Sequence, residues 1–156
     1  MSSSSPLAGE QQTLSAANAS NPKIGSKAAD ADMPLYGAIS TFLQFPFATE
    51  LSTSDADVVV SGVPFDMATS GRPGSRFGPQ GIRQASANLA WEGERWPWDF
   101  CLSDHLNVAD IGDVLFKHGD PQSLVENLEA NALQVLETGK SMLSFGGDHF
   151  ISLPLL

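Results

Sequence analysis

The segment from Asp120 to Gly146, "DPQSLVENLEANALQVLETGKSMLSFG", predicts a helix followed by a strand and so decides the fold class. Asp120 is suited to cap a helix, Pro121 fits its first position, and Gly139 marks its end. The helix is expected to bury one apolar face, made of Leu124, Val125, Leu128, Ala132, Val135 and Leu136. The apolar run "KSMLSFG" that follows the glycine is predicted to be a strand.

Two further strands are predicted before this helix. "VVVSGV" at Val58–Val63 is a run of mostly β-branched residues, which suits a strand buried on both faces of a parallel sheet. "LNVADIGDVL" predicts a second strand with Leu106, Val108 and Ile111 as its apolar members. Residues 106–145 would then form a βαβ unit, whose strands are parallel. The sequence therefore predicts an α/β fold with a parallel sheet.

A glycine-rich loop and a helix connect the first two strands. The loop, "PFDMATSGRPGSRFGPQG", lacks the lysine and the spacing of a phosphate-binding P-loop, so nucleotide binding is not expected. The helix is predicted in "PQGIRQASANLAW", with an apolar stripe of Ile82, Ala85 or Ser86, and Leu89. The arginines of this region are expected to pair with carboxylates that fix the loop or a subunit contact; they are Arg72, Arg76 and Arg83.

The two ends of the chain differ from its middle. Residues 1–34 form a Ser/Ala-rich arm with too few large apolar residues to form a core, and we expect it to be disordered. Residues 35–156 are expected to be one α/β portion, truncated at its C-terminal end. It begins with an irregular lead-in that contains Phe42, Phe45 and Phe47, and residues 147–156 read as the start of another helix.

The charge and cysteine content of the chain exclude some classes of binding partner and indicate a cellular compartment. Asp and Glu total 18 against 8 Lys and Arg, which gives a formal net charge of -10. Such a chain repels nucleic acid and anionic membranes and suits a cationic small molecule or a divalent metal. Cys101 is the only cysteine, which fits a reducing compartment, and no secretory signal or long apolar stretch is visible. We therefore expect a cytoplasmic protein.

Polar residues follow each predicted strand, where ligands bind in open α/β sheets. They are Asp66, Asp110, Asp113, Asp148 and His149.

The last two of these residues follow Gly146 and Gly147, which permit a sharp turn. Asp148 is predicted to cap a helix, and His149 in the first turn would stay neutral and keep a lone pair for a metal. One imidazole does not make a catalytic metal site, and a histidine at a helix start is more often a capping or packing residue. His105 and His118 are expected to face solvent.

Three segments together resemble a known family: "VVVSGVPFDMATSGRPGSRFGPQGIRQAS", "NVADIGD" and "MLSFGGDHFISLPLL". They are similar to the N-terminal half of the ureohydrolases of the arginase family, and within it most similar to the bacterial agmatinases. The resemblance covers roughly residues 56–156. It implies a three-layer α/β fold with a parallel sheet, of which this chain holds only the N-terminal strands and helices.

The resemblance also implies a function. Agmatinases use two Mn²⁺ ions to hydrolyse agmatine to putrescine and urea in polyamine biosynthesis, and the resemblance implies a homo-oligomer when the protein is complete. In this family the histidine of the GGDH motif binds metal, a role that transfers to His149. The other ligands come from DAHxD and DxDxxDP motifs, which these 156 residues do not contain. We therefore expect this chain to hold no catalytic residue and to be inactive alone.

Two alternatives remain open. The chain could be a non-catalytic fragment that docks onto full-length subunits. It could also belong to a relative that acts on guanidinobutyrate or formiminoglutamate, because the loops that contact substrate in this family lie mostly downstream.

Overall fold

The central strand of the sheet is β1 (Val58–Val63), because its side chains are apolar on both faces. Val59, Val60 and Val63 are fully buried. β1 pairs in parallel with β2 (Val108–Asp113) on one side and with β3 (Ser141–Gly146) on the other. The strand order is therefore β2-β1-β3, and the predicted parallel sheet is confirmed.

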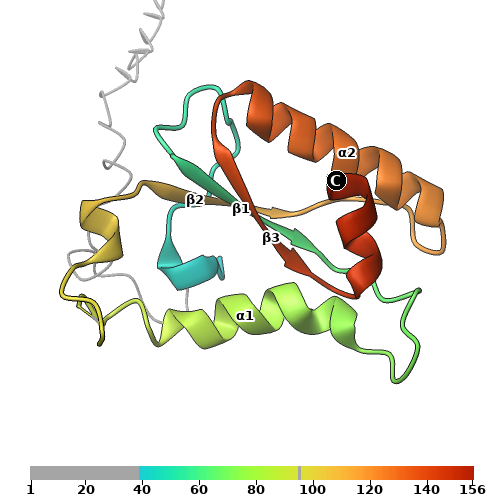
Figure 1. The fold of residues 1–156 in the computed structure, drawn as a ribbon, viewed down its shortest axis with the longest axis horizontal. Coiled ribbons are helices and arrows are strands. Elements are labelled where there is room, and N and C mark those ends of the chain that lie inside the picture. Colours follow the sequence, from blue (N-terminus) through green and yellow to red (C-terminus); the bar gives the residue numbers. More distant parts are fainter. Residues whose placement is uncertain (1–38, 95) are drawn as a thin grey trace, which may run out of the picture.

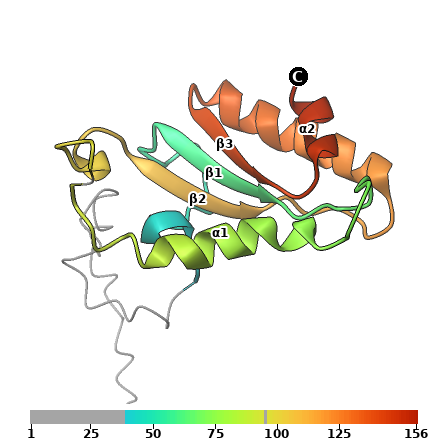
Figure 2. The same cartoon turned by 60° about the horizontal axis from the view of Figure 1, so that its bottom comes forward.

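Helices cover the two faces of this sheet in the computed structural model, which describes residues 39–94 and 96–156. α1 (Gly78–Ala87) follows β1 and lies on one face, and α2 (Pro121–Glu137) follows β2 and lies on the other (Figures 1 and 2). The arm predicted at residues 1–34 lies outside the described residues. Within the described part, every helix is too short or too polar to cross a bilayer.

The helix predicted after the second strand is confirmed as α2. The Asp120 carboxylate accepts a hydrogen bond from the Ser123 N–H (3.2 Å), and Gly139 adopts a φ of +74° just beyond the helix. The fully buried side chains of α2 are Leu124, Leu128 and Val135. Leu136, which we expected on this face, is 58% exposed, because it lies about 100° around the helix from Val135.

The stripe predicted for α1 is wrong for its two large apolar members, although Ser86, one of its alternatives, is buried. Ile82 and Leu89 are 39% and 40% exposed, and Leu89 lies beyond the end of the helix. The residues that α1 buries are Pro79, Arg83 and Ser86. Apart from Pro79 in its first turn, this helix therefore buries polar side chains and leaves Ile82 partly exposed, unlike an ordinary surface helix.

Arg83 and Asp110 explain this arrangement. The Asp110 side chain on β2 is fully buried and accepts two hydrogen bonds from the Arg83 guanidinium, from Nε to Oδ2 at 2.8 Å and from Nη2 to Oδ1 at 2.9 Å. Arg83 also donates to the Gly112 carbonyl (2.9 Å) and to Asp113. Burial alone would lower the pKa of Arg83, but the hydrogen bonds and negative charges of the two aspartates outweigh it and raise this pKa.

Asp110 and the buried Ser86 of α1 also hold the lead-in segment. Asp110 Oδ2 accepts the Phe42 N–H (2.9 Å), and the Ser86 hydroxyl oxygen accepts the Leu43 N–H (2.8 Å). The Phe42 ring then packs edge-on against Phe145 of β3, with centroids 4.9 Å apart. Residues 42–44 form one 3₁₀ turn, so the lead-in is irregular as predicted.

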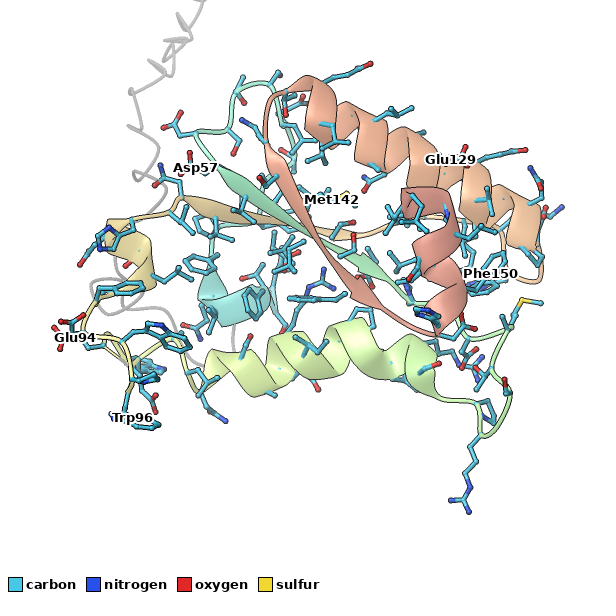
Figure 3. The ribbon with its side chains drawn as sticks, in the orientation of Figure 1. Asp57, Glu94, Trp96, Glu129, Met142 and Phe150 are labelled. Carbon is cyan, nitrogen blue, oxygen red and sulfur yellow. The ribbon has the colours of Figure 1, made fainter. Side chains whose placement is uncertain are left out.

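Two predictions made for the ends of elements differ from what the structure shows. Leu106 lies before β2 and is 39% exposed, so it is not one of the strand's apolar members. The C-terminal segment is a 3₁₀ helix, His149–Leu155. Its Phe150 ring packs near Phe65, with centroids 5.5 Å apart, at the end of the sheet where β3 finishes (Figure 3).

We predict that Leu128→Ala lowers the free energy of unfolding by about 2 to 5 kcal/mol, because it leaves a cavity beneath a fully buried position. Urea unfolding followed by circular dichroism measures this loss. Leu133 on the same helix is 59% exposed, and Leu133→Ala is expected to change the free energy by less than about 0.5 kcal/mol. Equal losses in the two variants would show that α2 does not pack as described.

We predict that Arg83→Met destabilises the fold by about 3 to 5 kcal/mol, because Asp110 would remain buried without its cationic partner. Thermal and urea unfolding measure the effect. Arg72 in the preceding loop is exposed, so Arg72→Met serves as the matched control and is expected to change stability by less than about 0.5 kcal/mol. A neutral Arg83→Met variant would contradict the role of this ion pair.

Candidate functional site

The turn Gly146–His149 is bound to the segment that follows β1. The Gly147 N–H donates to the Val63 carbonyl (3.0 Å), and the Asp148 N–H donates to the Phe65 carbonyl (2.8 Å). A Cβ on Gly147 would overlap the Phe65 carbonyl oxygen, so a side chain at this position requires the two segments to separate. The glycine pair is therefore needed for this close approach as well as for the turn.

Asp148 caps the last helix as the sequence predicts. Its Oδ1 accepts the Phe150 N–H (3.0 Å), and its Oδ2 accepts the Ala68 N–H (2.8 Å). Both oxygens thus have backbone donors, which supports a capping role over a metal-ligand role for Asp148. The bond to Ala68 is a contact that no sequence pattern indicated.

His149 occupies the first position of the 3₁₀ helix, and its side chain is exposed. Its Nδ1 lies 3.5 Å from the Ser152 hydroxyl oxygen, at the outer limit of a hydrogen bond. The imidazole is therefore accessible from solvent at the carboxyl end of the sheet. This is the placement that a metal ligand needs, and the ligand role itself stays a prediction.

The other carboxylates expected at this rim are used in structural contacts. The Asp66 side chain is 6% exposed, accepts the Gly74 N–H (2.8 Å) and forms an ion pair with Arg76 (3.4 Å). Asp110 and Asp113 both bind Arg83. Two of the three arginines thus pair with carboxylates as predicted, and the three carboxylates stabilise the loop and α1.

The described residues contain no group of three or more His, Cys, Asp or Glu side chains that is arranged to hold a metal ion. His105 and His118 are exposed, as expected, and their rings lie against Phe100 and Phe116 respectively. Cys101 is half-buried and pairs with Glu94 in an isolated backbone bridge, at the other end of the molecule from Phe150 (Figure 3). The three histidines of the described residues thus lie apart from any cluster of ligand side chains, and the metal role of His149 is not tested by this arrangement.

Comparison with known proteins supports the resemblance found in the sequence. A model of the arginase family matches residues 56–156. The agmatinase of Serratia proteamaculans (strain 568) is 60% identical over 115 residues, which are 74% of this chain and 38% of that protein. The chain thus spans 38% of the length of this curated relative.

Solved structures show the same similarity. A hypothetical agmatinase from Burkholderia thailandensis is 39% identical, with a TM-score of 0.71 over 78% of this chain and 38% of the other. A formiminoglutamase from Trypanosoma cruzi, whose structure was solved with Mn²⁺, is 26% identical, with a TM-score of 0.57 over 75% of this chain and 39% of the other. The three-layer α/β fold expected from the resemblance is confirmed, and this chain belongs to the arginase family.

Proposed function

We propose that these residues are the N-terminal part of an agmatinase-type ureohydrolase, which hydrolyses agmatine to putrescine and urea. The observation that carries the proposal is the 60% identity to the agmatinase of Serratia proteamaculans. The formal net charge of -10 is consistent with a cationic substrate. We place the protein in polyamine biosynthesis in the cytoplasm, as a homo-oligomer when complete.

The proposed cofactor is a pair of Mn²⁺ ions, with His149 as one ligand. Two such ions, when bound, supply an activated water for attack on the guanidinium carbon. The related formiminoglutamase structure contains Mn²⁺, and imidazole is a suitable ligand for this ion. The exposed His149 side chain fits this role, and the remaining ligands must come from outside the described residues.

The contacts of this chain's charged residues agree with a cationic substrate. Arg83 is buried against two aspartates, and Arg76 is tied to Asp66. The buried Arg83 is therefore not free to enter a substrate pocket, where it would repel agmatine, and the half-exposed Arg76 is paired with a carboxylate. Asp148 is occupied by two backbone N–H groups, which leaves His149 as the proposed ligand of the GGDH turn.

A second candidate function is a non-catalytic fragment that docks onto other chains. One observation favours it: among the described residues β3 has a partner strand on one side only, and Leu143 on this strand is 42% exposed. An unpaired strand edge is a template for further pairing. Action on formiminoglutamate or guanidinobutyrate is a weaker alternative, because the formiminoglutamase is 26% identical to this chain and the agmatinase 60%.

We predict that the 115 matched residues of this chain, substituted for their counterpart in the Serratia agmatinase, give an active Mn²⁺-dependent enzyme. His149→Ala in this chimaera is expected to lower kcat/KM for agmatine by more than about 100-fold. Removing a group that only orients a metal ligand typically lowers metal affinity or activity about 10- to 100-fold, so removing the ligand itself is expected to have a larger effect. Urea release and bound Mn²⁺ per chain are the measurements.

His118→Ala is the control for this variant, because His118 is exposed and lies on the loop before α2. It is expected to retain full activity and full Mn²⁺ content. An active chimaera in which His149→Ala keeps its Mn²⁺ would refute the ligand assignment. An inactive chimaera that is folded would count against the agmatinase proposal.

We predict that the 156-residue chain alone releases no urea from agmatine at any Mn²⁺ concentration, because its described residues contain no cluster of three or more side chains arranged to hold a metal ion. A coupled assay for ammonia after urease treatment measures urea release by the isolated chain. Turnover by the chain alone would show that the ligand set is complete within it.

Assays with guanidinobutyrate and formiminoglutamate test the alternative substrates in the chimaera.

A further inference from the structure

Asp148 joins two segments that lie 80 residues apart in the sequence. An ordinary helix cap binds N–H groups of its own first turn, as Asp120 does with Ser123. Asp148 makes the same kind of bond to Phe150, and its second oxygen accepts the Ala68 N–H at 2.8 Å. One carboxylate therefore fixes both the turn that carries His149 and the loop after β1.

Backbone hydrogen bonds on either side of this link join the same two segments, and we call these bonds together with the Asp148–Ala68 bond the frame of the turn. The Gly147 and Asp148 N–H groups bind the carbonyls of Val63 and Phe65, so the two segments run side by side up to Ala68. Asp66, in the same segment, accepts the Gly74 N–H and so closes the following loop onto itself. The position of this loop relative to the turn is set by these backbone bonds and by the Asp148 carboxylate.

His149 depends on this frame for its direction. Its ring has one weak neighbour, Ser152 at 3.5 Å. The backbone of the turn therefore sets the direction of the Cα–Cβ bond of His149, and Asp148 fixes that backbone on both sides of His149: its own N–H binds Phe65, and its carboxylate binds Phe150. The bond to Ala68 adds a side-chain link to the two backbone bonds that join the turn to the end of β1 and the segment after it.

We propose that Asp148 is a positioning residue, which directs His149 toward the metal by coupling its turn to Ala68. The proposal rests on the proposed function, since it assumes that His149 binds Mn²⁺. It goes beyond capping, because a cap requires the bond to Phe150 alone. The bond to Ala68 is the feature that distinguishes positioning from capping.

Asp148→Ser separates these two roles. A serine hydroxyl can still cap the helix by accepting the Phe150 N–H, but it is too short to reach Ala68 at the same time. Asp120→Ser is the matched control, because Asp120 caps α2 through a single N–H and serine preserves that bond. Asp148→Asn keeps the side-chain volume and offers one acceptor oxygen in place of two, so it is the second variant if the serine variant unfolds.

The first measurement is amide hydrogen exchange in the metal-free 156-residue chain. Asp148→Ser is expected to accelerate exchange at Ala68 at least tenfold and to leave Phe150 close to the parent value. Asp120→Ser is expected to change neither amide. Unchanged exchange at Ala68 would show that the Asp148 bond does not hold the loop and would overturn the proposal.

The second measurement is Mn²⁺ affinity in the chimaera with the Serratia agmatinase. Asp148→Ser is expected to weaken Mn²⁺ binding about tenfold or more, as is typical when groups that orient metal ligands are removed, while Asp120→Ser binds as the parent does. Faster exchange at Ala68 with unchanged Mn²⁺ affinity would show that Asp148 links the two segments without affecting the metal site. This result would refute the proposed positioning role of Asp148. If the parent chimaera itself bound no Mn²⁺, the proposed function would fail, whereas the exchange result would still report on the bond to Ala68.

Discussion

The ion pair between Arg83 and Asp110 determines how α1 lies on the sheet. A fully buried carboxylate is stable only when a cation and hydrogen bonds compensate it, and Arg83 supplies both from the helix opposite β2. The helix must therefore turn its polar side inward, whatever the position of its apolar residues. The lead-in segment depends on the same carboxylate, because Asp110 also accepts the Phe42 N–H. One carboxylate on β2 thus places two other parts of the chain, α1 and the lead-in segment.

The buried ion pair explains why some elements were predicted correctly from the sequence and the face of α1 was not. β1 and α2 were predicted correctly because their local signals agree: a valine run for the strand, and a cap, an apolar face and a terminal glycine for the helix. The stripe of α1 was predicted wrongly because periodicity assumes that apolar residues face the core. The partner that overrides this pattern lies 27 residues further along the chain, and no local pattern reveals it.

Some features of the candidate site could likewise be predicted from the sequence, and others could not. The glycine turn, the Asp148 cap and the place of His149 in the first turn of the helix follow from neighbouring residues and were predicted. The contacts of Asp66 with Gly74 and of Asp148 with Ala68 were not, since they join a side chain to a backbone group and leave no periodic trace. Membership of the arginase family was predicted from the combination of three motifs and is confirmed. The metal role of His149 stays a prediction, because the described residues contain no cluster of ligand side chains around it.

The central place of β1 has a consequence for synthesis of the chain. β1 is made first, yet one of its two partners is β3, whose Ser141 pairs with Val58 near the C-terminal end. The ribosome adds roughly 5 to 20 residues per second, so the valine-rich strand waits several seconds with one side unpaired. During that interval its unpaired edge and its apolar side chains remain open to aggregation, and slow codons between β1 and β3 would lengthen this exposure.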